Sequence, residues 1–232
     1  MKILLLGANG QVGWELQRSL SLLGELSIHD KDTADFHNPA ALASLVHNLN
    51  PHVIVNAAAY TAVDQAETDI ETAYKVNAEA VASLAKAAKA VNAWLVHYST
   101  DYVFDGKKQG RYFEDDITNP ASVYGKSKRE GELAVINSGC RHFIFRTSWV
   151  FASRGNNFAK TMIKLARERD ELKVVADQIG APTSAEFIAD VTALAIYNLS
   201  MLGHFEPFDS TQDSSSCHPE PSDPARDESS CH

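Results

Sequence analysis

The sequence predicts an α/β fold, a doubly wound parallel sheet covered by helices on both faces. Short apolar runs alternate along the chain with longer segments of helical periodicity, and a glycine-rich loop directly follows the first apolar run. Strands that are apolar throughout are typical of parallel sheets, because helices bury both of their faces.

The elements of this fold can be assigned in order along the chain. The predicted strands cover residues 2–6, 26–30, 52–59, 93–100 and 143–150. The predicted helices cover residues 11–23, 39–49, 70–91, 156–168 and 185–199, and one further helix contains Tyr124. Pro39 suits the start of its helix, since an N–H group in the first turn would lack a partner within the helix anyway.

Composition and charge exclude several classes of protein. The net charge of −9 disfavours nucleic acid and anionic membranes as partners. The apolar run in MKILLLGANG is too short for a signal peptide, and no stretch approaches the length of a membrane span. Cys140 is the only cysteine of residues 1–202, so no disulfide framework is expected. We therefore expect a cytoplasmic protein.

The last thirty or so residues differ in composition from the rest. Residues 203–232 contain seven Ser, four Pro and seven acidic residues, which leaves little apolar surface to bury. Such a segment is expected to be disordered, and its sequence looks unrelated to the domain of residues 1–202. Cys-His pairs at 217–218 and 231–232 could in principle bind zinc, but adjacent ligands give awkward geometry, and we disfavour this reading.

A glycine loop, GANGQVG at residues 7–13, ends the first strand and opens the first helix. Gly7 permits a tight turn, Gly10 lets the backbone approach a pyrophosphate, and Gly13 allows the helix to pack closely. The amino terminus of a helix also favours negative charge. This context predicts a dinucleotide-binding, Rossmann-like fold. The predicted phosphate-binding residues are Gly7, Gly10, Gln11, Val12 and Gly13.

The identity of the dinucleotide stays open at this point. Asp30 ends the second strand, where an acid can bind the adenosine ribose hydroxyls. Lys31 beside it could instead accept a 2′-phosphate, so both NADH and NADPH are possible cofactors. The third strand ends in small side chains that leave room for a cofactor. The predicted site further includes Asp35, Phe36, Ala57, Ala58, Ala59 and Tyr60.

Tyr124 and Lys128 are four residues apart on a predicted helix, which puts both on one face. A phenol is a poor proton donor at neutral pH until a nearby ammonium stabilises its phenolate. The pair is therefore a candidate for a general acid and the charge that tunes it. Taken alone, the spacing fits equally a half-buried tyrosine and a solvated lysine.

Several motifs together resemble the extended short-chain dehydrogenase/reductase family. They are the glycine loop, NAAA after the third strand, STDYVFDG after the fourth and Tyr-x-x-x-Lys on the next helix. More closely, MKILLLGANGQVGWEL, HYSTDYVFDG, NPASVYGKSKREGE and DQIGAPTSAEFIAD resemble the dTDP-4-dehydrorhamnose reductases. The resemblance runs from Met1 to about Asn198.

The resemblance implies NAD(P)H-dependent reduction of the C4 ketone of dTDP-4-dehydro-6-deoxy-L-mannose to dTDP-L-rhamnose. Tyr124 would protonate the ketone oxygen, Lys128 would hold the cofactor ribose and lower the Tyr124 pKa, and Thr100 would orient the oxygen. The resemblance also implies that Asp101, Tyr102 and Trp149 contact the nucleotide-sugar substrate. Strand-end capping and aromatic packing explain these three residues about as well.

Some members of this family join two subunits through a divalent cation. Glu15 and Glu186 match the carboxylates that would bind it, which implies Mg²⁺ at the interface of a homodimer. Both residues could equally be solvated acids on helices, and we slightly favour that interpretation.

Other functions compete with ketone reduction. Nucleotide-sugar 4,6-dehydratases carry a glutamate after the Thr-Asp pair, whereas Thr100-Asp101 is followed here by Tyr102. Another nucleotide-sugar reductase or epimerase remains possible. A regulatory subunit of methionine adenosyltransferase also resembles these reductases and binds cofactor without turnover. The intact set of Thr100, Tyr124 and Lys128 favours catalysis.

The small substrate lobe of this fold is expected to be incomplete. In the family the sugar nucleotide lies between the cofactor domain and a lobe built largely from carboxy-terminal sequence, whereas the resemblance stops near Asn198. We therefore expect residues 1–202 to form the NAD(P)-binding domain with part of the lobe. As given, the chain is expected to bind cofactor but to reduce the sugar feebly and to aggregate.

Overall fold

The computed structural model of the protein describes residues 1–203. The predicted disordered tail, with its two Cys-His pairs, lies outside the described residues apart from Gly203.

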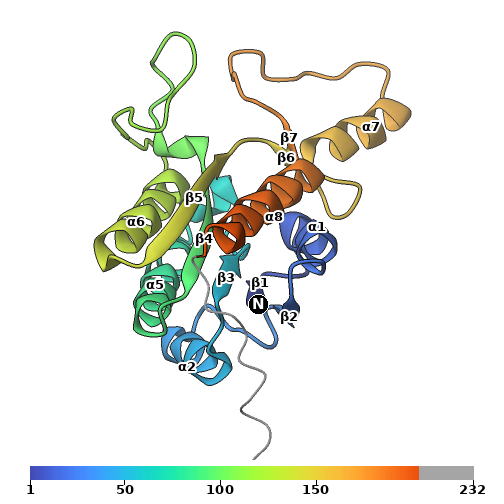
Figure 1. Ribbon diagram of the computed structural model, residues 1–232. Helices are drawn as coiled ribbons and strands as arrows, with labels where there is room; N and C mark the ends of the chain where they lie inside the picture. The colour runs from blue at the N-terminus through green and yellow to red at the C-terminus, as the bar shows by residue number, and fades with distance from the viewer. Residues whose placement is uncertain (204–232) are drawn as a thin grey trace, which may run out of the picture.

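A sheet of five parallel strands forms the centre of the molecule (Figure 1). The strands are β1 (Lys2–Leu6), β2 (Glu25–His29), β3 (Val53–Asn56), β4 (Trp94–Thr100) and β5 (Arg141–Thr147), in the spatial order β2-β1-β3-β4-β5. The predicted doubly wound parallel sheet is confirmed. Strand order reverses between β1 and β3, and ligands of such sheets bind at this point, beyond the carboxyl ends of the strands.

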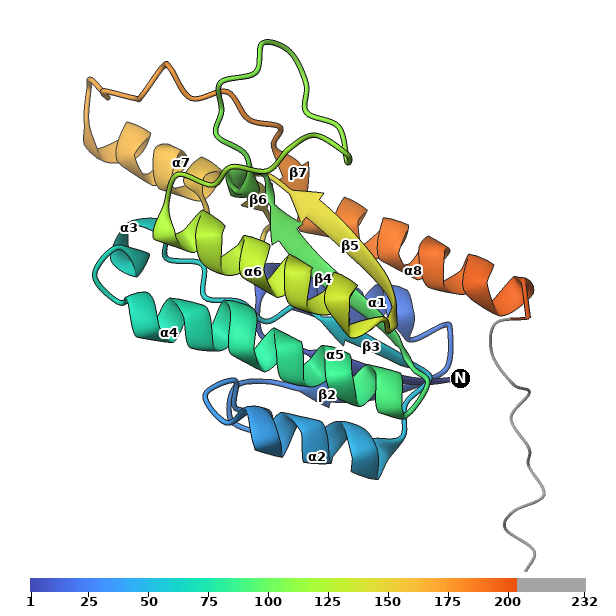
Figure 2. The same ribbon diagram turned by 90° about the vertical axis from the view of Figure 1, so that its left-hand side faces the viewer.

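Helices cover both faces of the sheet (Figure 2). On one face lie α2 (Pro39–Leu49), α5 (Ala80–Ala90) and α6 (Val123–Ser138), and on the other lie α1 (Gln11–Leu20) and α8 (Ala185–Met201). Alternate strand residues supply the two cores, because successive side chains point to opposite faces. Leu4 and Ile54 pack with Leu84 of α5, whereas Leu5 and Val55 join Ile196 of α8 in the second cluster.

The long predicted helix at 70–91 contains a π-helical turn. It begins with α4 (Ile70–Tyr74), continues through the π-turn Lys75–Glu79 and ends as α5. The turn places the side chain of Asn77 inside the protein, where only 1% of the residue is exposed. Single π-turns within α-helices occur often at functional sites.

Smaller elements stand beyond the carboxyl edge of the sheet. The predicted strand at 143–150 divides, since Trp149 adopts a left-handed φ of 45° between β5 and β6 (Val150–Phe151). β6 pairs in parallel with β7 (Thr183–Ser184), and α7 (Phe158–Glu168) lies between them in sequence. The remaining elements are α3 (Val63–Ala66) and a 3₁₀ turn at Asp101–Val103. None of the helices within residues 1–203 is long and apolar enough to span a membrane.

Candidate active site

The glycine loop joins β1 to α1 at the carboxyl edge of the sheet. Gly7 has a φ of 78°, and a Cβ on this residue would lie 2.5 Å from the Ala58 nitrogen. A Cβ on Gly13 would lie 2.1 Å from the Gly7 carbonyl oxygen. Gly10, which precedes α1, brings no side chain to cap the helix. No side chain of these glycines therefore covers the amino terminus of α1, and a pyrophosphate could approach the backbone there.

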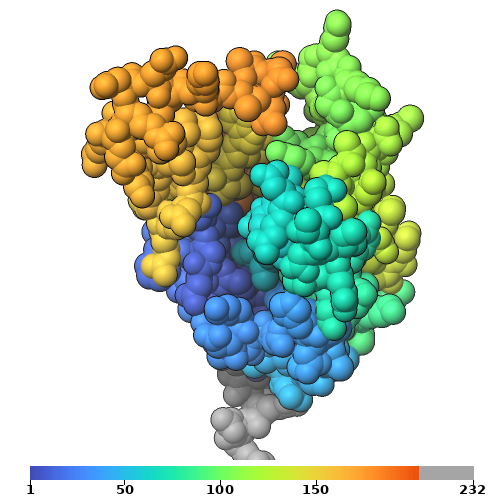
Figure 3. Space-filling view, turned by 180° about the vertical axis from the view of Figure 1, so that it is seen from behind, coloured from blue at the N-terminus to red at the C-terminus, as the bar shows by residue number. Residues whose placement is uncertain are grey.

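A pocket of about 380 Å³ opens beside this loop. Figure 3 shows the hollow between the dark blue glycine-loop region and the cyan segment that follows β3. The predicted cofactor residues that line it are Gly7, Gly10, Asp30, Asp35, Phe36, Ala57, Ala58, Ala59 and Tyr60. Gln11, Val12 and Gly13 form the first turn of α1. The wall also contains residues outside the predicted set, namely Asn9, Lys31, Ala34, His37, Thr72 and Val76.

Asp30 carries a well-anchored negative charge at one end of this pocket. Its Oδ1 accepts from the Asp32 nitrogen at 3.0 Å and from the Thr33 nitrogen at 3.2 Å, and its Oδ2 accepts from Asn9 Nδ2 at 2.8 Å. The hydrogen bond from Asp32 is the largest of the effects that hold the Asp30 pKa below its usual value. Because Lys31 also lines the pocket, charges of both signs face this end of the site.

Asp35 and His37 form a hydrogen-bonded pair on the pocket wall. Asp35 Oδ1 accepts from the His37 backbone nitrogen at 2.8 Å and lies 3.1 Å from His37 Nδ1. These hydrogen bonds lower the Asp35 pKa. The predicted set included Asp35 but not its histidine partner.

The three predicted catalytic residues come together where β4 ends and α6 begins. Thr100 is the last residue of β4, and Tyr124 and Lys128 lie one turn apart on α6. The three residues are 6%, 9% and 2% exposed. The Thr100 hydroxyl is close enough to Tyr124 to lower the pKa of its phenol. The structure thus brings together residues that the sequence separates by a long loop.

The start and end of α6 are fixed by local signals. Ser122 Oγ accepts a hydrogen bond from the Gly125 nitrogen at 3.1 Å and caps the helix. The helix ends at Gly139, which has a left-handed φ of 69°. A Cβ on Gly125 would lie 2.2 Å from the Tyr102 carbonyl oxygen, so the helix can begin directly against the turn that follows Thr100.

Lys128 carries its charge into the interior. Its Nζ donates to the Tyr98 carbonyl oxygen at 2.7 Å. Burial lowers the Lys128 pKa to about 8, although the Glu132 carboxylate acts in the opposite direction. The side chain therefore stays largely protonated at neutral pH, close to the point at which it would lose its charge.

Tyr124 keeps its proton at neutral pH. Burial raises its pKa to about 12, and the nearby Thr100 hydroxyl offsets part of that rise. Lys128 is not among the groups that shift this pKa in the protein alone. That Lys128 lowers the Tyr124 pKa when cofactor and substrate are bound thus stays a prediction.

Two of the predicted substrate residues, Asp101 and Tyr102, contact this group. Asp101 accepts from Thr100 Oγ1 at 3.1 Å and from Ser148 Oγ at 2.6 Å. The Tyr102 ring meets the Tyr124 ring edge-on, with centroids 5.7 Å apart. Trp149 is 41% exposed in its left-handed conformation, a backbone state that a bulky residue rarely adopts.

Asn77 is a site residue that the sequence prediction did not include. Its Oδ1 accepts from the Tyr60 nitrogen at 2.9 Å, and its Nδ2 donates to the Tyr60 carbonyl at 3.0 Å and to Ser127 Oγ at 3.1 Å. Ser127 in turn donates to the Tyr124 carbonyl at 2.8 Å. One amide therefore connects the pocket wall to the catalytic helix.

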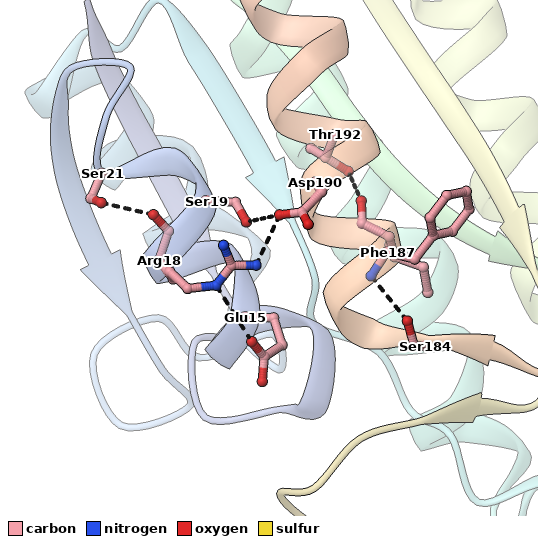
Figure 4. A network of polar contacts seen from close by, with 9 residues as sticks. Glu15, Arg18, Ser19, Ser21, Ser184, Phe187, Asp190 and Thr192 are labelled. Atoms are coloured by element: carbon pink, nitrogen blue, oxygen red, sulfur yellow. Dashed lines mark hydrogen bonds and ion pairs between the residues drawn. The ribbon is translucent and has the colours of Figure 1, made fainter.

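The predicted metal ligands receive no support from the structure. Glu15 Oε2 lies 3.9 Å from Arg18 Nε, and the same guanidinium bonds Asp190 of α8 at 2.8 Å (Figure 4). Within residues 1–203 no group of three or more His, Cys, Asp or Glu side chains could hold a metal ion. The contact between α1 and α8 within the chain is made by direct ion pairs and hydrogen bonds.

A nicotinamide-dependent short-chain dehydrogenase/reductase is the class of protein that this fold and site define. Comparison with known proteins narrows the assignment. The family model described as the RmlD substrate binding domain matches residues 1–205. The chain belongs to this family, that of the dTDP-4-dehydrorhamnose reductases.

Named relatives support the assignment. The dTDP-4-dehydrorhamnose reductase of Burkholderia thailandensis is 58% identical over 196 residues, which cover 84% of this chain and 66% of that protein. The reductase of Escherichia coli K12 is 54% identical over 200 residues, covering 84% and 67%. The chain thus spans about two thirds of the length of these curated relatives.

Solved structures agree with the sequence comparison. A dTDP-4-dehydrorhamnose reductase from Clostridium acetobutylicum superposes with a TM-score of 0.83 at 44% identity, covering 86% of this chain and 71% of that one. The enzyme from Bacillus anthracis, in complex with NADP, gives a TM-score of 0.81 at 41% identity, covering 84% and 70%.

The depressed Lys128 pKa predicts a pH dependence of stability. Below pH 8 the lysine is charged in both folded and unfolded chains, so the full cost of burying the charge is present. As pH rises from 8 towards 10.5, the folded state loses this proton before the unfolded state does, and the free energy of unfolding rises by about 2 kcal/mol between pH 7 and pH 10. Urea unfolding at these pH values should show this rise relative to Lys128→Met.

A lysine on the surface of the same helix supplies the control. Lys126 is exposed, so Lys126→Met should keep the wild-type rise. If the free energy of unfolding changed with pH in the same way in wild type and in Lys128→Met, the rise could not be assigned to Lys128.

Proposed function

We propose that this chain binds NADPH or NADH and takes part in reduction of the C4 ketone of dTDP-4-dehydro-6-deoxy-L-mannose to dTDP-L-rhamnose. The observation that carries the proposal is the buried group of Thr100, Tyr124 and Lys128 at the same sheet edge as the glycine-loop pocket. The names of the relatives supply the substrate, and the NADP complex of one of them supports the cofactor.

The residues present fit a dinucleotide. The bare backbone around Gly7 and Gly13 leaves room for a pyrophosphate at the start of α1, and the pocket beyond it has room for an adenosine. Lys128 would hold the hydroxyls of the nicotinamide ribose. When bound, the reduced nicotinamide supplies the hydride.

Each member of the catalytic group has a separate role in the proposed reaction. Tyr124 gives its proton to the ketone oxygen as hydride reaches C4, because its raised pKa keeps it protonated until then. The Lys128 ammonium stabilises the phenolate left behind. The Thr100 hydroxyl, which donates to Asp101 in the protein alone, turns its proton to the ketone oxygen and orients it.

We also propose that residues 1–202 combine the NAD(P)-binding domain with part of a substrate lobe. β6, α7 and β7 stand apart from the five-stranded sheet and would belong to that lobe. Trp149 at their junction, together with Asp101 and Tyr102, would contact the nucleotide-sugar.

Tyr124→Phe tests the catalytic assignment. The substitution removes the proton donor but keeps the ring and its contact with Tyr102. General acid catalysis contributes about 10²–10⁴-fold, so the rate of NADPH oxidation with the keto-sugar should fall by that order while NADPH affinity stays the same. Single-turnover measurements with protein in excess over sugar keep a slow reaction measurable.

Tyr197→Phe is a matched control, since Tyr197 is exposed on α8. It should leave the rate unchanged. A Tyr124→Phe protein that reduces the sugar at the wild-type rate would rule out Tyr124 as the acid.

Asp30→Ala tests which cofactor the pocket favours. Loss of this carboxylate removes an acceptor for the ribose hydroxyls and a charge that repels a 2′-phosphate. We therefore expect NADH affinity to fall by about tenfold and NADPH affinity to fall less or to rise, as measured by fluorescence titration.

The neighbouring acid provides the comparison for this experiment. Asp32 is exposed and lies outside the pocket wall, so Asp32→Ala removes one charge without removing a pocket residue. Equal losses for both cofactors in Asp30→Ala would mean that Asp30 does not face the ribose.

A further inference from the structure

A buried carboxylate lies one helical turn beyond Lys128. Glu132 is completely buried, and two arginines hold it. Arg146 of β5 binds both of its oxygens, with Nε–Oε1 at 2.9 Å and Nη2–Oε2 at 2.8 Å. Arg129 Nη1 donates to Oε2 at 2.7 Å. Such two-pronged contacts fix the carboxylate in one orientation.

The charges around this carboxylate are unbalanced. Lys128 and Arg129 approach from α6 and Arg146 from β5, and besides Glu132 the Glu114 carboxylate acts on Arg146 from the loop between β4 and α6. The groups that face this cluster from β4 carry no charge: the buried Ser99 hydroxyl lowers the Glu132 pKa, and burial keeps the His97 pKa well below its usual value. Without Glu132, three positive charges would face one another in the interior.

Stability alone does not account for an ion pair in this position. Replacing a buried ion pair by apolar residues of the same volume is often neutral or stabilising. The placement of Glu132 is informative because its charge acts on Lys128, the one member of the cluster with a proposed role in the reaction.

We propose that Glu132 is a positioning residue for the active site, because its carboxylate, fixed by Arg129 and Arg146, holds Lys128 as an ammonium group against the Tyr98 carbonyl. The inference rests on the proposed function for its purpose, since only a charged Lys128 can stabilise the Tyr124 phenolate. Glu132 itself is one turn away from Lys128 and acts through it.

The same arginine also reaches the loop between β4 and α6. Arg146 Nη1 donates to the Glu114 carbonyl at 3.1 Å, and its guanidinium lies 5.0 Å from the centroid of the Phe104 ring. The carboxylate that acts on Lys128 therefore also orients a side chain that holds this loop.

Direct titration of Lys128 tests the proposal without substrate or cofactor. The ¹³Cε signals of labelled lysine can be followed by NMR from pH 6 to pH 11, and the Lys128 signal can be assigned by its absence in Lys128→Met. In Glu132→Gln the pH midpoint of the Lys128 titration should fall by about one unit. The substitution removes the attractive Glu132 charge and leaves the repulsive charges of Arg129 and Arg146 without their partner. Glu130→Gln, an exposed acid on the same helix, should leave the midpoint unchanged.

A second variant covers the case in which Glu132→Gln fails to fold. Arg129→Gln removes a repulsive charge and leaves Glu132 held by Arg146, so the Lys128 midpoint should rise. The proposal is overturned if Glu132→Gln titrates like the Glu130→Gln control, or if Arg129→Gln leaves or lowers the midpoint. A failure of the proposed function would appear separately, as unchanged turnover in Tyr124→Phe.

Discussion

The ammonium group of Lys128 lies in the protein interior, and much of the site is arranged around that charge. Removing it from water brings the pKa down to about 8, so the protein has to compensate to keep it charged. The Tyr98 carbonyl, 2.7 Å from Lys128 Nζ, supplies a direct acceptor, and Glu132 supplies the compensating charge. The hydrogen bond to Tyr98 and the position of Glu132 both require α6 to pack closely on β4 and on the π-turn. Gly131 permits this, since a Cβ there would lie 2.1 Å from the Asn77 carbonyl oxygen.

The parallel sheet explains why the proposed cofactor pocket and the proposed catalytic group are neighbours. All five strands end at the same edge, so the glycine loop after β1, the alanines after β3 and Thr100 at the end of β4 meet there. Asn77 then ties the segment after β3 to α6 through Tyr60 and Ser127. A shift of the catalytic helix would therefore also disturb the wall of the cofactor pocket, and the two halves of the site behave as one unit.

Local signals in the sequence were enough to predict most of this architecture. Apolar runs located the strands, Pro39 marked a helix start, and the glycine loop located the pocket that we propose binds the dinucleotide. The π-turn at Lys75–Glu79 was missed, because hydrophobic periodicity cannot resolve one extra residue in a long alanine-rich helix. His37 and Glu132 were missed for another reason: their roles depend on partners, such as Arg146, that only the folded chain brings close. The metal site predicted at Glu15 and Glu186 came from resemblance alone and stays a prediction without support from the described residues, among which Glu15 lies beside Arg18.

The central claim is that the buried Lys128 charge serves cofactor binding as well as catalysis. Titration of NADPH into wild type, Lys128→Met and the exposed control Lys126→Met at pH 7 tests it most directly, with circular dichroism to confirm that all three fold. Loss of a charged hydrogen-bond donor costs about 1.5–3 kcal/mol, so Lys128→Met should bind NADPH roughly tenfold to a hundredfold more weakly, and Lys126→Met should match wild type. Equal NADPH affinities in all three folded proteins would contradict the account.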